Sequence, residues 1–401
     1  MQSPLLDPAP VPLLRILFVD DERNILDGLR RVMHGMRSEW DMAFASSGAE
    51  ALAMMAEATP DVIVTDMRMP GMSGRDLLLE VKRLHPQVVR LILSGYAETT
   101  SVMQIAGVAH QYLSKPCEST VLKAALARTF ALRKLLQDKK QLCRIGQAES
   151  LPSLPSVYQR IVSCLQGPDP SVAEVARIVG CDVVMTAMVL KLANSAFFGA
   201  RQTFRTAERA VSFLGVDTIA GLVLGHSIFH QFSGAEKAGL SLEQLWEHSL
   251  RTATGARALA RYEKWSAELA DEAFLAGIVH DLGKLVLATR APVAGLGGEA
   301  RSGAASPPWD EHHAGVGAYL LGLWGFSDTL VEAVAYHHTP SRSGAAKFDL
   351  ACLLHVADRL DRRSRPDDAG FTEEGLEGSY LESLGLTQRM GEWQAVWAQE
   401  G

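Results

Sequence analysis

The sequence predicts an α/β domain with a doubly wound parallel sheet, followed by a domain built almost wholly of helices. Two observations predict the first domain: short apolar segments recur with helical patterns between them, and polar residues end these segments. One observation predicts the second domain, because beyond about residue 150 nearly every segment shows apolar residues at helical spacing.

Four apolar segments have the length and composition of buried parallel strands: Ile16–Val19, Asp61–Thr65, Leu91–Leu93 and Gln111–Ser114. Reactive side chains end them, namely Asp20, Asp21, Asp66, Ser94 and Lys115. The carboxyl ends of parallel strands share one edge of a sheet, so these side chains are expected to converge. Clustered carboxylates repel one another unless a hard cation such as Mg²⁺ lies among them. Lys115 and Ser94 can then neutralise and hydrogen-bond a phosphoryl group on Asp66.

The first crossover helix is predicted to follow Asp21 directly. Its apolar residues recur at three- and four-residue spacing on one face: Ile25, Leu26, Leu29, Val32, Met33 and Met36. A second helical pattern runs from Glu118 to about Gln147 and gathers lysines toward its end. The last helix of the first domain is therefore predicted to continue as a linker that can transmit rotation or dimer pairing.

With these residues in place, the segment 13–132 resembles a response-regulator receiver domain, which implies a flavodoxin-like sheet of five strands. The resemblance implies that Asp66 is the phosphoacceptor and that Asp20, Asp21, Asp66 and the carbonyl of Arg68 hold Mg²⁺. It also implies a switch made of Ser94, Tyr112 and Lys115. A sensor histidine kinase would supply the phosphoryl group, and the domain would catalyse its own dephosphorylation.

Composition excludes several other classes of protein. The 401 residues carry a formal net charge of −7 and 47% are hydrophobic, which suits packed domains and gives no general attraction for nucleic acid or anionic membrane. Five cysteines without a CxxC spacing indicate reduced thiols and a cytoplasmic location. No apolar run is long enough to span a bilayer, and direct DNA binding is disfavoured since no basic recognition helix emerges.

The prolines of Leu151-Pro152-Ser153-Leu154-Pro155 break the linker helix and begin the second domain. The predicted organisation is a flexible arm over 1–12, the α/β domain over 13–132, a helical linker over 133–150, a helical domain over 151–345 and a C-terminal helical extension of unknown role over 346–401. Within the helical domain, Asn194 and Ser195 are expected to make hydrogen bonds at a helix crossing.

The helical domain resembles the HDOD domain, a relative of the HD metal-dependent phosphohydrolases that usually serves as a signalling or scaffolding module. The resemblance rests on the Leu-x-x-Leu-Pro opening at Leu151, the Leu-Ala-Asn-Ser-Ala segment at Leu192 and the His-Asp-x-Gly-Lys turn at His280. It implies a binding output and no demonstrated turnover.

Imidazole and carboxylate groups recur on successive predicted helices, and they form the set with which an HD enzyme would hold one or two divalent transition metals: His248, His280, Asp281, His313, His337, His338 and Asp358. Lys284 could stabilise the charge of a phosphate. Two features oppose catalysis: a Gly-Tyr-Pro signature is absent, and Gln244 stands one helical turn before His248, where an acid would serve. Three interpretations stay open: a hydrolase centre, a structural metal site, and packed histidines without metal.

The function predicted from these observations is that of a phosphorelay response regulator in which phosphorylation of Asp66 switches an HDOD signalling output. A receiver-regulated HD-type phosphohydrolase that cleaves a cyclic dinucleotide is the alternative. The expected partners are a sensor histidine kinase, a downstream signalling protein and a second copy of the chain in a homodimer.

Overall fold

The protein is described from a computed structural model. It describes residues 13–95, 108–115, 117–135, 154–167, 171–194, 203–232, 240–289, 312–363 and 377–400. Contacts divide the chain into two compact units, and the division falls at Ala131, inside helix α5 (Ser119–Leu135). We call the described part up to Ala131 the N-terminal unit and the part from Leu154 onward the helical unit, and treat each separately.

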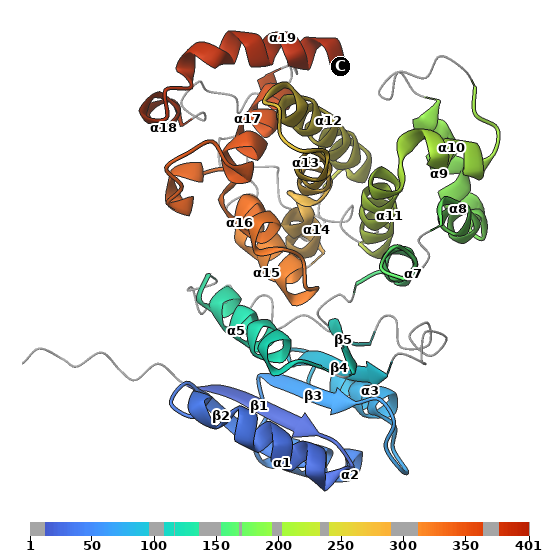
Figure 1. Ribbon diagram of the computed structural model, residues 1–401, viewed down its shortest axis with the longest axis vertical. Helices are drawn as coiled ribbons and strands as arrows, with labels where there is room; N and C mark the ends of the chain where they lie inside the picture. Colours follow the sequence, from blue (N-terminus) through green and yellow to red (C-terminus); the bar gives the residue numbers. More distant parts are fainter. Residues whose placement is uncertain are drawn as a thin grey trace, which may run out of the picture. The chain divides into compact units, whose positions relative to one another are not determined.

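Five parallel strands form a single sheet in the N-terminal unit, in the order β2-β1-β3-β4-β5 (Figure 1). They are β1 (Leu14–Val19), β2 (Trp40–Ala45), β3 (Val62–Asp66), β4 (Val89–Gly95) and β5 (Gln111–Lys115). The order reverses at β1, as in doubly wound sheets, and ligands bind such sheets outside the carboxyl ends of the strands at the reversal. The predicted fold of the first domain is confirmed.

The strand register brings the predicted reactive residues to this edge. Val19 pairs with Thr65 across β1 and β3, so Asp20 and Asp66 come next on adjacent strands. Asp66 pairs with Leu93, and Gly95 pairs with Lys115. The pairing alone therefore gathers the ends of four strands.

Alternate residues of the buried strands face opposite layers. Leu17, Ile63 and Ile92 share a core with residues of α2 (Gly48–Glu57) and α3 (Gly74–Leu84), such as Met55 and Leu77. On the other face, Phe18 stacks on Phe44 with ring centroids 5.3 Å apart, and Arg30 of α1 (Arg23–Val32) lies over the Phe44 ring. Helices therefore cover both faces, which explains why these strands read as continuous apolar runs.

Two predicted features fall partly outside the described residues. The linker prediction covers 133–150, of which the structure describes the helix only as far as Leu135. The arm predicted over 1–12 is not described either. Both therefore stay predictions.

The helical unit contains no strand among its described residues, as predicted. Its first group of helices is α7 (Ser156–Leu165), α8 (Val172–Gly180), α9 (Val183–Ala193), α10 (Ala207–Leu214) and α11 (Val216–Gln231). Its second group is α12 (Leu242–Tyr262), α13 (Ala267–Val279), α14 (Leu282–Ala288), α15 (His313–Leu323), α16 (Asp328–Tyr336), α17 (Leu350–Arg363), α18 (Gly378–Ser383) and α19 (Met390–Glu400). Helix α12 packs against α13, α17 and α19, and α16 packs against α15 and α17 (Figure 1).

Serine or threonine side chains begin five of the described helices of this unit: α8, α10, α12, α13 and α16. Each accepts a hydrogen bond from a backbone N–H three residues later, as Ser241 does at α12, Ser266 at α13 and Ser327 at α16. Such caps satisfy N–H groups that have no partner within the helix and contribute about 1 kcal/mol each. These caps mark the first residues of the helices that they begin.

Asn194 makes the kind of hydrogen bonds that the sequence suggested. Its amide nitrogen donates to the carbonyls of Leu190 and Phe204, and its oxygen accepts from the backbone N–H of Phe204. Asn194 thus joins the end of α9 to the segment before α10. Ser195 lies outside the described residues.

Within the described part of the chain, we find no single helix with both the length and the apolar composition to cross a membrane; α10 and α11 pass this test only as a pair, bent by 110°. Four of the cysteines, Cys117, Cys164, Cys181 and Cys352, are free thiols.

Candidate functional site

The carboxyl edge of the sheet holds an ion-pair cluster centred on Lys115. Its ammonium group donates to Asp20 Oδ2 at 3.0 Å and forms an ion pair with Asp66 Oδ1. Burial opposes the charge on Lys115. The hydrogen bonds that its ammonium group donates to Asp66 and Asp20 outweigh this effect and raise the pKa of Lys115 above the ordinary value. The lysine therefore stays charged beside the carboxylates and is placed to meet a phosphoryl group on Asp66.

Backbone groups orient both carboxylates. The N–H of Arg68 donates to Asp66 Oδ2 at 2.7 Å, and the N–H of Glu22 donates to Asp20 Oδ1 at 2.9 Å. Asp20 is 2% and Asp66 9% exposed, whereas the neighbouring Asp21 is exposed, so the carboxylates lie between the core of the sheet and the solvent. Carboxylate oxygens at a partly open edge are the donors that Mg²⁺ takes together with water and phosphoryl oxygens. The residues present fit the ion that the sequence predicts.

The other predicted members of this site are placed less completely. Asp21 follows Asp20 and is exposed, and Arg68 is exposed with its N–H bound to Asp66. Ser94 pairs with Ser114 at the end of β4, and Tyr112 pairs with Ile92 in β5. The side chains of Ser94 and Tyr112 lie outside the described residues, so their role as switch residues stays a prediction.

Gly74 explains part of the turn that follows the acceptor. Its N–H donates to the carbonyl of Met67, and a Cβ atom at this position would lie 1.9 Å from the carbonyl oxygen of Asp66. Only glycine permits α3 to start this close to the backbone of Asp66. The turn Asp66-Met67-Arg68-Met69-Pro70-Gly71-Met72-Ser73-Gly74 therefore returns the chain over the acceptor.

The helical unit brings all seven predicted imidazole and carboxylate residues together. Five of them lie at helix ends: His280 follows α13, Asp281 precedes α14, His313 opens α15, and His337 and His338 follow α16. His248 lies within α12 and Asp358 within α17. Six of them are buried, and the His338 side chain is 29% exposed. We call these seven residues the histidine cluster.

Asp281 lies at the centre of the histidine cluster. Its Oδ2 is 3.5 Å from His248 Nε2 and 3.4 Å from His280 Nε2, whereas its Oδ1 is 3.0 Å from His313 Nε2 and 3.9 Å from His337 Nε2. One carboxylate thus faces two groups of imidazoles with its two oxygens. This is the arrangement in which a carboxylate bridges two metal ions.

Each group of imidazoles forms a set of possible ligands. His248, His280 and Asp358 offer ligand atoms that all lie within 4.8 Å of one another, and so do His313, His337 and His338. His248 Nε2 is also 3.1 Å from Asp358 Oδ1. Nitrogen and oxygen donors in this mixture suit Mn, Fe or Zn better than Mg or Ca.

Hydrogen bonds fix which nitrogen of three histidines faces the cluster. Nδ1 of His280 lies 2.8 Å from the carbonyl of Gly277, Nδ1 of His337 lies 2.7 Å from the carbonyl of Val334, and Nδ1 of His248 lies 2.6 Å from Asp361 Oδ2. Because these partners only accept, Nδ1 must donate, and a neutral ring then has its lone pair on Nε2. The Nε2 atoms of His248 and His280 are 3.1 Å apart, so a proton or a metal ion must lie between them if two lone pairs are not to face one another.

The surroundings shift the pKa values of the histidine cluster in different directions. Burial, then the neighbouring histidines, lower the pKa of His337 well below its usual range, which keeps the ring neutral. Burial also opposes charge on His280, but Asp281 and Asp358 outweigh it and raise its pKa to about 9. The pKa values of Asp281 and Asp358 lie well below the ordinary value despite burial, because of His280 and Arg362 respectively.

The donor set fits divalent metal ions. The buried atoms Asp358 Oδ2 and His338 Nδ1 have no hydrogen-bond partner among the described residues, and they lie 3.9 Å apart. Buried polar atoms of this kind are expensive unless satisfied. The donors present therefore suit a metal site, and the three interpretations that the sequence left open stay predictions.

A glycine holds the two halves of the histidine cluster together. The His-Asp-x-Gly-Lys segment separates two helices, because α13 ends at Val279 and α14 starts at Leu282. A Cβ atom on Gly283 would lie 1.9 Å from the carbonyl oxygen of His313. The break and the glycine together allow α15 to deliver His313 to Asp281.

Sequence reasoning missed three charged residues next to the cluster and misread a fourth position. Arg251 and Asp361 form an ion pair behind His248, and Arg362 donates to Asp358 Oδ1 at 2.9 Å. Their spacing was a signal, because Arg251 and Asp361 follow His248 and Asp358 by three residues on the same helix faces. Gln244, considered as a lost ligand, is exposed in the first turn of α12.

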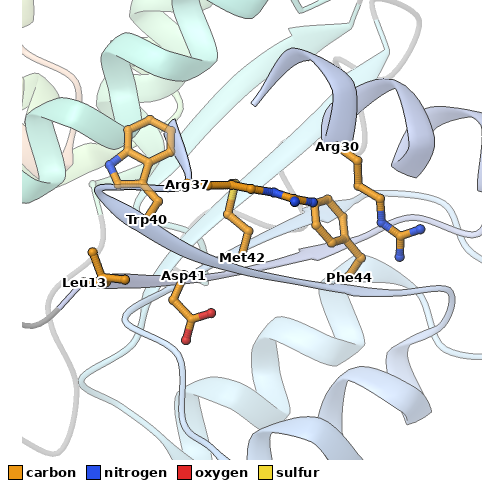
Figure 2. A pocket seen from close by; sticks show the side chains of 7 residues that line it. All are labelled: Leu13, Arg30, Arg37, Trp40, Asp41, Met42 and Phe44. Carbon is orange, nitrogen blue, oxygen red and sulfur yellow. The ribbon is translucent and has the colours of Figure 1, made fainter. Parts of the chain in front are cut away.

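A separate surface pocket of about 240 Å³ lies beside the edge strand β2 (Figure 2). Trp40, Met42 and Phe44 of that strand line it together with Arg30 and Arg37, and none of the predicted site residues does.

Comparison with known proteins agrees with both domains. A family model described as the response regulator receiver domain matches residues 16–127, which include the five-stranded sheet. A family model described as the HDOD domain matches residues 151–340. The chain therefore contains a response regulator receiver domain followed by an HDOD domain. The resemblances stated from the sequence are thereby confirmed.

Named relatives match part of this chain. The transcriptional regulatory protein YesN of Bacillus subtilis is 34% identical over 127 residues, which is 30% of this chain and 33% of that protein. The hydrogenase transcriptional regulatory protein HoxA of Cupriavidus necator is 32% identical over 177 residues, 40% of this chain and 36% of that protein. The chain thus spans about a third of the length of these relatives.

Two solved structures resemble one part each. A response regulator receiver domain protein from Clostridium thermocellum is 32% identical, covers 31% of this chain and 99% of its own, and has a TM-score of 0.29. An HDOD domain protein of unknown function from Geobacter sulfurreducens is 21% identical, covers 68% of this chain and 93% of its own, and has a TM-score of 0.48.

Proposed function

We propose that a sensor histidine kinase phosphorylates Asp66 and that the phosphorylated receiver switches an HDOD output that holds two divalent metal ions. The observation that carries the first half is the double contact of Lys115 with Asp66 and Asp20. A phosphoryl group on Asp66 would compete for the same ammonium group and so change the contacts of Asp20. Mg²⁺ would offset the charge of the carboxylates and the phosphoryl oxygens.

The second half of the proposal rests on Asp281, whose two oxygens face two sets of Nε2 atoms. The output would act on a downstream signalling protein, and the switch would change its binding or the pairing of two copies of the chain. A cytoplasmic location belongs to the proposal, supported by the free cysteine thiols.

Replacing Lys115 by Ala is expected to leave measurable phosphorylation by acetyl phosphate but to remove the response of the helical unit. The lysine contacts both carboxylates, so it couples the acceptor to its surroundings, and such coupling is worth about 1–3 kcal/mol. Hydrogen exchange of α12 to α17, compared with and without acetyl phosphate and Mg²⁺, measures the response. Lys123→Ala, in α5, is the matched control and should respond as the parent does. An unchanged response in Lys115→Ala would remove this lysine from the switch.

A second candidate function is hydrolysis of a phosphodiester, such as a cyclic dinucleotide, at the histidine cluster. Lys284 favours it, since its ammonium group lies 2.8 Å from Asp281 Oδ2 and adds a positive charge where a phosphate would bind. Divalent ions held there would supply charge that polarises a phosphoryl oxygen and activates water. Against it, the cluster is buried except at His338.

This second candidate predicts Mn²⁺-dependent turnover of a cyclic dinucleotide by the parent and none by a His280→Ala, Asp281→Ala double variant. Turnover is measured with the protein phosphorylated and not phosphorylated. Equal rates in parent and double variant would exclude hydrolysis and leave a metal-holding signalling output.

A further inference from the structure

Two packed helices each contribute a pair of residues to one buried group. Helix α12 supplies His248 and Arg251, and α17 supplies Asp358 and Asp361, with a spacing of three residues in both cases. Residues three apart lie on one face of a helix, so both pairs face the contact between α12 and α17. His248 and Asp358 belong to the histidine cluster, whereas Asp361 and Arg251 lie immediately behind it.

Asp361 uses its two oxygens on two different partners. Its Oδ2 accepts from His248 Nδ1 at 2.6 Å, and its Oδ1 accepts from Arg251 Nε at 2.6 Å. The residue is 0% exposed, so the carboxylate depends on these charge-assisted bonds in place of water. Arg251 supplies the countercharge, which leaves Oδ2 available to His248.

We propose that Asp361 is a positioning residue of the metal centre: it holds His248 in the tautomer with the proton on Nδ1 and turns Nε2 toward Asp281 and Asp358. The inference rests on the metal-holding function proposed above. His280 and His337 have backbone carbonyls as Nδ1 partners, so His248 is the one of these three whose orientation depends on a side chain. Carboxylates that orient a ligating histidine typically contribute 10–100-fold to metal affinity.

A purely structural role would make Asp361 only the buried counterion of Arg251. In that case its replacement would lower stability and leave the tautomer of His248 and the affinity for metal unchanged. The two roles therefore differ in readouts other than stability.

The experiment compares Mn²⁺ binding by the full chain and by Asp361→Asn in titration calorimetry. The parent is expected to bind two ions, and the variant to bind one of them about 10–100-fold more weakly. The control is Glu247→Gln, which removes an exposed carboxylate that lies 3.7 Å from Arg251 Nη1. This variant should bind both Mn²⁺ ions as tightly as the parent does. Equal affinities in Asp361→Asn and the parent would overturn the role of Asp361 alone, whereas a parent that binds no ion would overturn the proposed metal-holding function as well.

A second measurement needs no variant. In ¹⁵N spectra of the parent with labelled histidine, His248 should carry its proton on Nδ1. A His248 ring with the proton on Nε2 alone would overturn the proposal even if Asp361→Asn failed to fold.

Discussion

Replacing Asp66 by Asn is expected to abolish phosphorylation by acetyl phosphate in the presence of Mg²⁺. An amide is no nucleophile toward phosphorus. The substitution also removes the ion pair with Lys115 and one of the carboxylates proposed to hold Mg²⁺. Phosphate incorporation, measured from the mass of the intact protein, should fall to background. Chelation of Mg²⁺ should do the same to the parent, since the carboxylates and the phosphoryl oxygens then lack a shared cation.

Asp76→Asn is the matched control for this loss. Asp76 is an exposed carboxylate at the start of α3, in the same loop-to-helix region, where it accepts from Ser73 Oγ at 2.7 Å. It should be labelled as well as the parent. Labelling of Asp66→Asn at the parental level would disprove the assignment of the acceptor.

Divalent transition metal is expected to stabilise the parent strongly and the Asp281→Asn variant hardly at all. Asp281 faces both sets of imidazoles, so an amide in its place weakens both metal positions at once. A ligand present at 100 times its Kd adds about 2.7 kcal/mol to the free energy of unfolding. For a domain of this size that corresponds to a rise in Tm of roughly 5–10 °C, which a thermal scan with and without Mn²⁺ measures.

Glu268→Gln serves as the control here, because Glu268 is an exposed carboxylate in the first turn of α13, the helix that ends at His280. It should gain as much from Mn²⁺ as the parent. The same gain in Asp281→Asn would show that the ion binds elsewhere and would contradict the bridging position of Asp281.

The receiver site could be predicted from the sequence because its residues follow strands. Asp20, Asp66 and Lys115 each end an apolar segment, and parallel pairing brings strand ends together whatever the details of packing. Side-chain partners could not be predicted in this way. Lys115 contacts both Asp20 and Asp66 because of the depth at which each carboxylate lies, which a sequence does not show. Gly74 packs on the backbone of Asp66 because of the path of the turn, which a sequence does not show either.

The histidine cluster was predictable as a set of residues but not as a geometry. The sequence shows imidazoles and carboxylates on separate helices, and helical patterns do not say which ends meet. The turn at His280 and Asp281 could be read from its motif, but the angle it sets between α13 and α14 could not. Asp361 was missed because a carboxylate one turn after Asp358 looks like a solvated charge until the burial of α17 is known.

Helix α17 also changes where the output domain should be said to end. The HDOD match stops at residue 340, yet Asp358 and Asp361 come from α17, and the bond from Asp361 to His248 joins residues 113 positions apart. Closing a loop of that length costs conformational entropy, which the buried contacts of α17 offset. The segment beyond the family match is therefore part of the histidine cluster, and a chain cut at residue 340 would lack two of the carboxylates that surround His248.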